Sequence, residues 1–160
     1  MSEVLEREVE KLAVHAKTKK VQLRKGETMV EVDQDRLEDF VSRLVNQLNV
    51  RHLTTITGLD IGQNIEIIYH FWLEKDTIHI KTIIPKTKPT AVSIVQIVPG
   101  AILYEMEIHD MFGVTFTGNP WMDRKLLLPD SWPADLPPPL LKTVKPTEIR
   151  KRLGLEVETK

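Results

Sequence analysis

The sequence predicts an α+β fold: a two-layer domain in which helices cover a mostly antiparallel sheet, with an extended Pro-rich C-terminal arm. Apolar residues recur at helical spacing over residues 34–48 and alternate with polar residues over residues 64–84. Six of the ten prolines lie between residues 129 and 146, and a proline-dense segment is stiff and extended. We therefore expect an α+β domain over residues 1–115 and an arm over residues 116–160.

The first half of the domain is predicted to hold two helices and three strands. An apolar stripe predicts a helix over residues 3–16, and two short strands follow around a turn at Lys25-Gly26. The cleanest helical pattern spans residues 34–48. Its core-facing residues are Leu37, Phe40, Val41, Leu44, Val45 and Leu48. A strand rich in Thr and Ile comes next and is expected to end at Gly58.

An antiparallel hairpin is predicted for the segment that follows, because two runs alternate apolar and polar residues. The apolar positions are Ile65, Ile67, Tyr69, Phe71 and Leu73 in the first run, and Ile78, Ile80 and Ile84 in the second. A tight connection at residues 75–76 would place His70 opposite Lys81 and His79 opposite Trp72. We interpret both histidines as surface or interface residues.

A further helix is predicted after the break at Pro99-Gly100. It covers residues 101–112, and Gly113 is positioned to end it. Beyond this helix regular structure is expected to fade, except for a last helical turn capped by Thr147.

The composition excludes several classes of function. Hydrophobic residues make up 41% and charged residues 28% of the chain, which predicts a packed core. The net charge of −1 provides no basic field for nucleic acid. Cysteine is absent, which excludes disulfides, iron–sulfur ligation by this chain and a cysteine nucleophile. No signal peptide and no apolar run of about 18 residues is present, so we expect a membrane link only through partners.

Few residues suggest chemistry. Glu105 and His109 share one face of a helix, but a metal site needs three or four ligands, and neither Glu107 nor Asp110 converges on them. A Glu–His pair on the helix surface is the simpler interpretation. The alternative is a small metal-dependent hydrolase that uses Glu105, His109 and one hairpin histidine. No Gly-x-Ser-x-Gly elbow or phosphate-binding loop occurs, so we predict no catalytic, cofactor-binding or metal-ligating residue.

Residues 104–132, YEMEIHDMFGVTFTGNPWMDRKLLLPDSW, carry several motifs in order. Glu-x-Glu precedes Asp-Met-Phe-Gly, Phe-x-Gly-x-Pro, an Arg-Lys pair, and leucines with Pro and Trp. This order resembles the diagnostic segment of the C-subunit family of NADH dehydrogenase, the small soluble component of respiratory complex I. The family has counterparts in membrane-bound nickel–iron (NiFe) hydrogenases and related archaeal complexes. Met106, His109 and Asn119 depart from the bacterial and mitochondrial pattern and favour those counterparts.

The resemblance implies a non-catalytic scaffold that binds no cofactor. Such a scaffold docks on a hydrogenase-like large subunit, next to an iron–sulfur small subunit, and the NiFe centre and iron–sulfur clusters are expected in those partners. The whole complex would lie on the cytoplasmic side of the cell membrane and translocate ions. In the membrane-bound hydrogenase type it would evolve hydrogen from reduced ferredoxin. The alternatives are the same role in an NADH–quinone, F(420)H(2) or sulfur-reducing relative.

The same resemblance, together with the apolar character of the arm, predicts which residues contact the partner. In this interpretation the arm wraps the neighbouring subunit. The predicted contact residues are Glu105, Glu107, Asp110, Phe112, Gly113, Phe116, Gly118, Pro120, Trp121, Arg124, Lys125, Leu127, Pro129 and Trp132.

Overall fold

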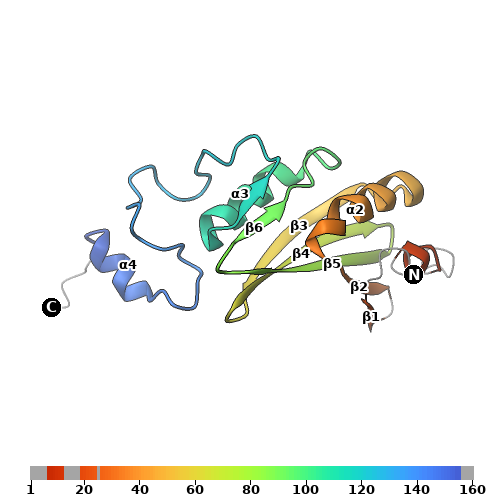
Figure 1. Ribbon diagram of the computed structural model, residues 1–160, viewed down its shortest axis with the longest axis horizontal. Helices are drawn as coiled ribbons and strands as arrows, with labels where there is room; N and C mark the ends of the chain where they lie inside the picture. Colours follow the sequence, from red (N-terminus) through yellow and green to blue (C-terminus); the bar gives the residue numbers. More distant parts are fainter. Residues whose placement is uncertain (1–6, 13–18, 25, 156–160) are drawn as a thin grey trace.

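The computed structural model describes residues 7–12, 19–24 and 26–155. Residues 7–12 are helical, while the ends of the predicted first helix and Lys25 lie outside the described residues. The other elements (Figure 1) are β1 (Lys19–Arg24), β2 (Glu27–Glu31), α2 (Gln34–Leu48), β3 (His52–Asp60), β4 (Asn64–Leu73), β5 (Asp76–Pro85), β6 (Thr90–Val92), α3 (Ala101–Phe112), β7 (Thr115–Thr117) and α4 (Pro146–Arg152).

Five of the described strands form one sheet in the order β1-β2-β5-β4-β3. Neighbouring strands are antiparallel except β2 and β5, which run parallel. β6 and β7 pair in parallel as a separate small sheet. The main sheet is therefore mostly antiparallel, as the sequence predicts.

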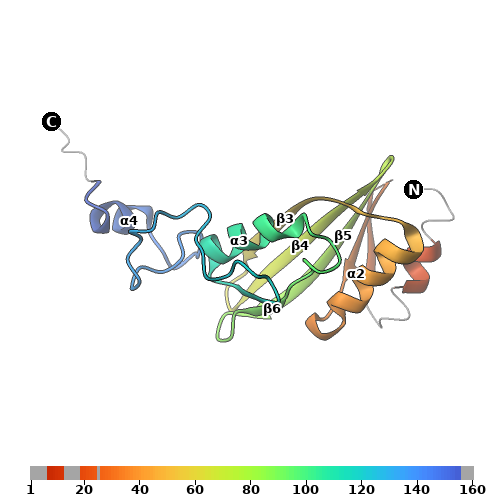
Figure 2. The same cartoon turned by 90° about the horizontal axis from the view of Figure 1, so that it is seen from above.

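Helices α2 and α3 lie on the same face of the main sheet (Figure 1, Figure 2). The buried side chains of α2 are Leu37, Phe40, Val41, Leu44 and Val45. They join one core with the inward side chains of the hairpin, which are Ile65, Ile67, Tyr69, Phe71, Ile78, Ile80 and Ile84. Each fully buried apolar side chain stabilises the fold by about 1.5–3 kcal/mol. The predicted two-layer α+β domain is confirmed.

α3 begins and ends at the predicted residues. It stops at Gly113, whose φ of 76° is left-handed and whose N–H donates to the His109 carbonyl at 2.8 Å. The helix lies close over β3 at Gly58. A Cβ added to Gly58 would stand 2.6 Å from the Phe112 ring and 2.9 Å from Ile108. Because glycine has no side chain, α3 can approach β3 this closely at Gly58.

Gly58→Ala is expected to lower the free energy of unfolding by about 1–3 kcal/mol, because α3 must move away from β3. Gly100→Ala is the matched control: its φ is −62°, and a Cβ there meets nothing within 4 Å. That control is expected to change stability by less than about 1 kcal/mol. Urea unfolding of the two variants measures the difference, and equal effects would contradict the close approach.

The hairpin between β4 and β5 has a different register from the predicted one. Leu73 pairs with Asp76, so the connecting residues are Glu74 and Lys75, and Glu74 adopts a left-handed φ of 54°. His70 therefore faces His79 directly, which makes the predicted pairings with Lys81 and Trp72 wrong. A glutamate with positive φ is not a favoured turn residue, which is why the sequence pattern misplaced the turn by one residue.

The C-terminal part of the chain departs from the predicted arm. Residues 118–145 consist mainly of turns and bends, so an extended arm is not confirmed. α4 begins at Pro146 behind the N-cap residue Lys145, so the predicted cap at Thr147 is wrong. Proline favours the first helical position, because its fixed φ suits a helix and no N–H is left unpaired there. Within the described ranges, no helix combines the length and hydropathy that crossing a membrane requires.

Candidate partner-docking surface

Glu105 on α3 lies inside the domain and is fully buried. Its carboxylate accepts hydrogen bonds from the Ser93 hydroxyl at 2.7 Å and the Ile94 backbone N–H at 2.9 Å. A third hydrogen bond, also 2.9 Å long, comes from the side-chain amide of Asn119. These donors lie before and after α3 in the sequence. The carboxylate therefore joins the segment before α3 to the loop after β7.

Burial raises the pKa of Glu105, because the cost of desolvating the carboxylate outweighs the three donors that favour its charged form. Tyr69 of β4 is fully buried as well. Its burial, and secondarily the charge of Glu105, raise the pKa of the phenol. The carboxylate is thus part of the domain interior, where burial makes its charged form less favourable than it is in water.

Asp110, five residues further along α3, organises the loop that follows β7. One of its carboxylate oxygens accepts the backbone N–H groups of Leu126, Leu127 and Leu128 at 2.8, 2.7 and 3.1 Å. Hydrogen bonds to a charged acceptor are stronger than neutral ones. Three of them converging on a single oxygen fix the course of this backbone against the helix.

Lys125 stabilises the same loop by hydrogen bonds to other residues of the loop. Its ammonium group donates to the backbone carbonyls of Pro129, Asp130 and Trp132 at 3.3–3.4 Å. Trp132 also donates from its indole N–H to the Leu136 carbonyl at 3.2 Å. We call residues 121–132 the leucine loop. The two charges that hold it, on Asp110 and Lys125, are both directed at backbone groups.

The leucine loop turns apolar side chains toward solvent. Leu127 is 56% exposed, and Leu126 and Trp121 are each 38% exposed. The Arg124 guanidinium lies over the Trp121 ring at 5.7 Å from its centroid, within the range of a cation–π contact. Exposed aromatic and aliphatic side chains beside an arginine are typical of the centre of a protein–protein interface.

The predicted contact residues divide by exposure. Four are buried: Glu105, Asp110, Phe112 and Phe116. Gly113 and Trp132 are half-buried. The exposed ones are Glu107, Gly118, Pro120, Trp121, Arg124, Lys125, Leu127 and Pro129. The two buried carboxylates shape this region from inside, whereas the exposed residues form the surface that a partner could touch.

Sequence reasoning missed three polar residues that organise this region: Ser93, Asn119 and Asp60. Asp60 ends β3, pairs with Lys86 and accepts the Lys142 backbone N–H at 2.8 Å. These contacts, with the Lys86 hydrogen bond as the largest cause, lower the pKa of Asp60 to about 2. No local sequence signal pointed to Lys142, which lies far away along the chain.

Hydrogen bonds cross the predicted boundary between residues 115 and 116. Asn119 reaches Glu105, the leucine loop reaches Asp110, and Lys142 reaches Asp60. The division into two parts stays a prediction. A chain cut at this boundary would lose partners of these three carboxylates.

The surface Glu–His pair on α3 is not formed, because Glu105 is buried and His109 Nδ1 lies 2.8 Å from the Val114 carbonyl oxygen. The hairpin histidines lie on the other face of the sheet, since they alternate with the core residues Tyr69 and Ile80. Among the residues that the structure describes, no three His, Asp or Glu side chains gather as metal ligands. The residues of the hydrolase alternative are therefore not brought together.

His70 and His79 form a pair of their own. Their Nδ1 atoms are 2.7 Å apart, so one ring donates a hydrogen bond to the other. His70 Nε2 lies 2.9 Å from the Thr57 hydroxyl. Burial, followed by the closeness of His79, lowers the pKa of His70. The pair is half-buried on the face of the sheet away from α2 and α3. This place agrees with a surface or interface role for the two histidines, which stays a prediction.

The architecture and the loop define an α+β protein with a preorganised, apolar-tipped loop beside its last core helix. Residues 30–150 match the family described as respiratory-chain NADH dehydrogenase, 30 kDa subunit. The chain belongs to this family, as the motifs in residues 104–132 predict.

Individual relatives agree with this assignment. The chain is 32% identical over 115 residues to the C subunit of NADH-quinone oxidoreductase from Roseiflexus castenholzii, covering 68% of this chain and 66% of that protein, just under two thirds of its length. It is 28% identical over 110 residues to the C subunit of F(420)H(2) dehydrogenase from Methanosarcina mazei, covering 64% and 69%. A chain of the membrane-bound sulfane sulfur reductase, an archaeal respiratory membrane complex, superimposes with a TM-score of 0.82 at 26% identity, covering 99% and 96%.

Proposed function

We propose that this chain is a non-catalytic assembly subunit of a membrane-bound, ion-translocating oxidoreductase related to complex I. It docks on a hydrogenase-like large subunit in the peripheral arm, on the cytoplasmic side of the membrane, beside an iron–sulfur small subunit. The NiFe centre and the clusters belong to those partners. The observation that carries the proposal is the leucine loop. Hydrogen bonds with Asp110 and Lys125 fix its backbone, and its apolar side chains face solvent.

The construction of the loop supports binding. Ordering a flexible loop on association costs free energy, and a loop already held in shape avoids most of that cost. Asp110 and Lys125 direct their charges at backbone groups, so the leucines of the loop present apolar area to a partner without an unpaired charge among them. Arg124 remains at the edge over Trp121, where it can pair with a carboxylate of the partner.

The type of complex is the finer part of the proposal. The match to the chain of the archaeal sulfane sulfur reductase complex covers nearly all of both chains, which supports an archaeal-type arm. We propose the membrane-bound hydrogenase type, which evolves hydrogen from reduced ferredoxin; the NADH–quinone, F(420)H(2) and sulfur-linked types are the alternatives. The sequence of the co-purified large subunit decides among them. Two Cys-x-x-Cys pairs in that partner indicate a hydrogenase, and their absence indicates a quinone- or sulfur-linked relative.

Leu127→Asp is expected to reduce recovery of the large subunit by about tenfold or more, because a charge would replace an apolar anchor at the interface centre. Leu127 is 56% exposed, so the free energy of unfolding is expected to change by less than about 0.5 kcal/mol. The measurement is the ratio of large subunit to tagged chain after affinity purification from cells.

Leu155→Asp is the matched control, because Leu155 is 60% exposed and lies outside the leucine loop. It is expected to leave recovery of the large subunit unchanged. If Leu127→Asp retained the large subunit fully, the leucine loop would not be the docking surface. If the unchanged chain recovered no other subunit, the assembly role itself would be wrong.

A further inference from the structure

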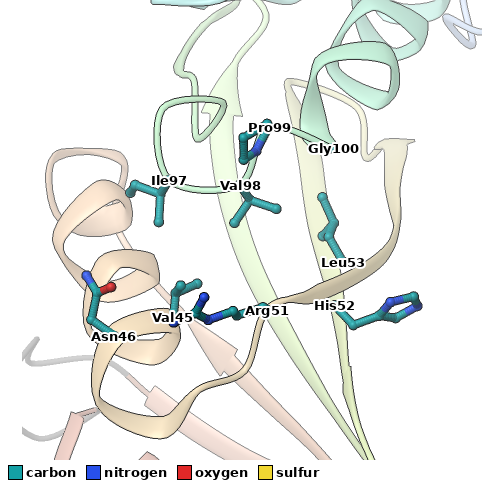
Figure 3. A pocket seen from close by; sticks show the side chains of 9 residues that line it. All are labelled: Val45, Asn46, Arg51, His52, Leu53, Ile97, Val98, Pro99 and Gly100. Atoms are coloured by element: carbon teal, nitrogen blue, oxygen red, sulfur yellow. The ribbon is translucent and has the colours of Figure 1, made fainter.

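A hollow of about 510 Å³ lies between the end of α2, the start of β3 and the turn that leads into α3 (Figure 3). Its walls are largely apolar: Val45 comes from α2, Leu53 from β3, and Ile97, Val98 and Pro99 from the turn. Pockets of this volume can take up a large side chain or a small ligand. This hollow is separate from the leucine loop, which packs beside the C-terminal half of α3.

The ionisable side chains that line the hollow can carry only positive charge. Arg51 and His52 are its only ionisable lining residues, and both are exposed at the rim. Asn46 adds a neutral polar group. Neither the last turn of α2 nor the first turn of α3 carries a carboxylate. In the described part of the chain, no ion pair involves Arg51. An occupant with a negative charge near an apolar group would complement this lining.

We infer that the hollow receives an apolar side chain of a partner subunit that stands next to a carboxylate, and that Arg51 pairs with this carboxylate. This inference rests on the proposed assembly role and adds a second contact, near the other end of α3 from the leucine loop. Buried apolar anchors in pockets carry much of the binding energy of an interface, and a charge at the rim selects the partner. A partner segment with Leu or Phe beside Asp or Glu has the required chemistry.

Gly100 makes the hollow testable without disturbing the fold. It lines the hollow, its φ of −62° suits any residue, and a Cβ there meets nothing within 4 Å. Gly100→Trp therefore places a bulky indole at the edge of the hollow, whereas Gly100→Ala adds only a methyl group there. Arg51→Glu reverses the rim charge, and Arg51→Lys preserves it.

The experiment isolates the complex through a tag on each variant and measures the recovered partner subunits. Gly100→Trp and Arg51→Glu are each expected to reduce recovery about tenfold, equivalent to about 1.4 kcal/mol, while Gly100→Ala and Arg51→Lys recover normal amounts. In parallel, a photo-crosslinking amino acid replaces Asn46 at the rim, and the crosslinked peptide is sequenced from the assembled complex. The expected peptide comes from another subunit and has an acidic residue next to an apolar one.

The outcomes separate this inference from the assembly role. Normal recovery with Gly100→Trp, together with loss on Leu127→Asp, would overturn the hollow as a docking site and leave the assembly role in place. A crosslink only to a second copy of this chain, or to a peptide without a carboxylate, would also overturn it. Failure of the unchanged chain to recover any subunit would overturn both.

Discussion

Glu105→Ala is expected to destabilise the fold by about 3–5 kcal/mol, which is a large effect for a single substitution. The change removes the acceptor of three donors, from Ser93, Ile94 and Asn119, in a site with no exposure to water. Each buried donor left without a partner costs about 1–3 kcal/mol. The lost side chain also leaves a cavity against the core. Chemical denaturation of the isolated chain measures the change.

Glu107→Ala is the matched control, since Glu107 lies on the same helix but is exposed. It is expected to change the free energy of unfolding by less than about 0.5 kcal/mol. Equal effects of the two substitutions would show that Glu105 does not hold the interior together.

The raised pKa of Glu105 gives a second readout. Because the folded state binds the proton more tightly than the unfolded chain, protonation favours folding. This contribution is fully present below the usual pKa of 4.5 and is lost as the pH rises through the higher folded value. In Glu105→Gln the group cannot titrate, so that part of the pH dependence is expected to disappear. An unchanged stability profile between wild type and Glu105→Gln would contradict the buried position of the carboxylate.

The helix that carries Glu105 illustrates what the sequence could predict. Local signals located α3 at both ends, because Gly113 supplies the left-handed residue that ends it and Pro99-Gly100 precedes it. The direction of the Glu105 side chain has no such local signal. Its partners Ser93 and Asn119 are 12 and 14 residues away, and only the packed fold brings them to the helix. The four-residue spacing of Glu105 and His109 was therefore open to interpretation as a surface pair or a metal site.

Turn geometry and the course of the proline-rich segment were less predictable for different reasons. The hairpin register depends on the left-handed conformation of Glu74, a state that most non-glycine residues avoid. Composition indicated that residues 129–146 are stiff. It could not show that Lys142 is bound to Asp60, because that hydrogen bond uses a backbone N–H that every residue except proline has. Family motifs indicated the segment that we propose as the docking region, whereas the hydrogen bonds that support it from inside became visible only in the structure.

Asp110→Ala is expected to release the leucine loop while leaving the domain folded. Water can reach the N–H groups of Leu126, Leu127 and Leu128 once the loop opens, so the global cost is smaller than at Glu105, about 1–3 kcal/mol. The local effect is larger. Hydrogen exchange at these three amides is expected to accelerate on the order of tenfold or more, because their only described acceptor is the Asp110 carboxylate. Mass spectrometry of exchanged peptides measures it.

Loss of the loop conformation should also be visible in assembly. A released loop must be ordered again on binding, and this entropic cost is expected to reduce recovery of the large subunit about as strongly as Leu127→Asp does. Asp123→Ala is the control, because Asp123 is an exposed carboxylate in the same loop, near Arg124 but apart from the leucine amides. If Asp110→Ala accelerated exchange but left recovery unchanged, the loop would fold without contributing to docking. If neither property changed, the three hydrogen bonds would not be what holds the loop.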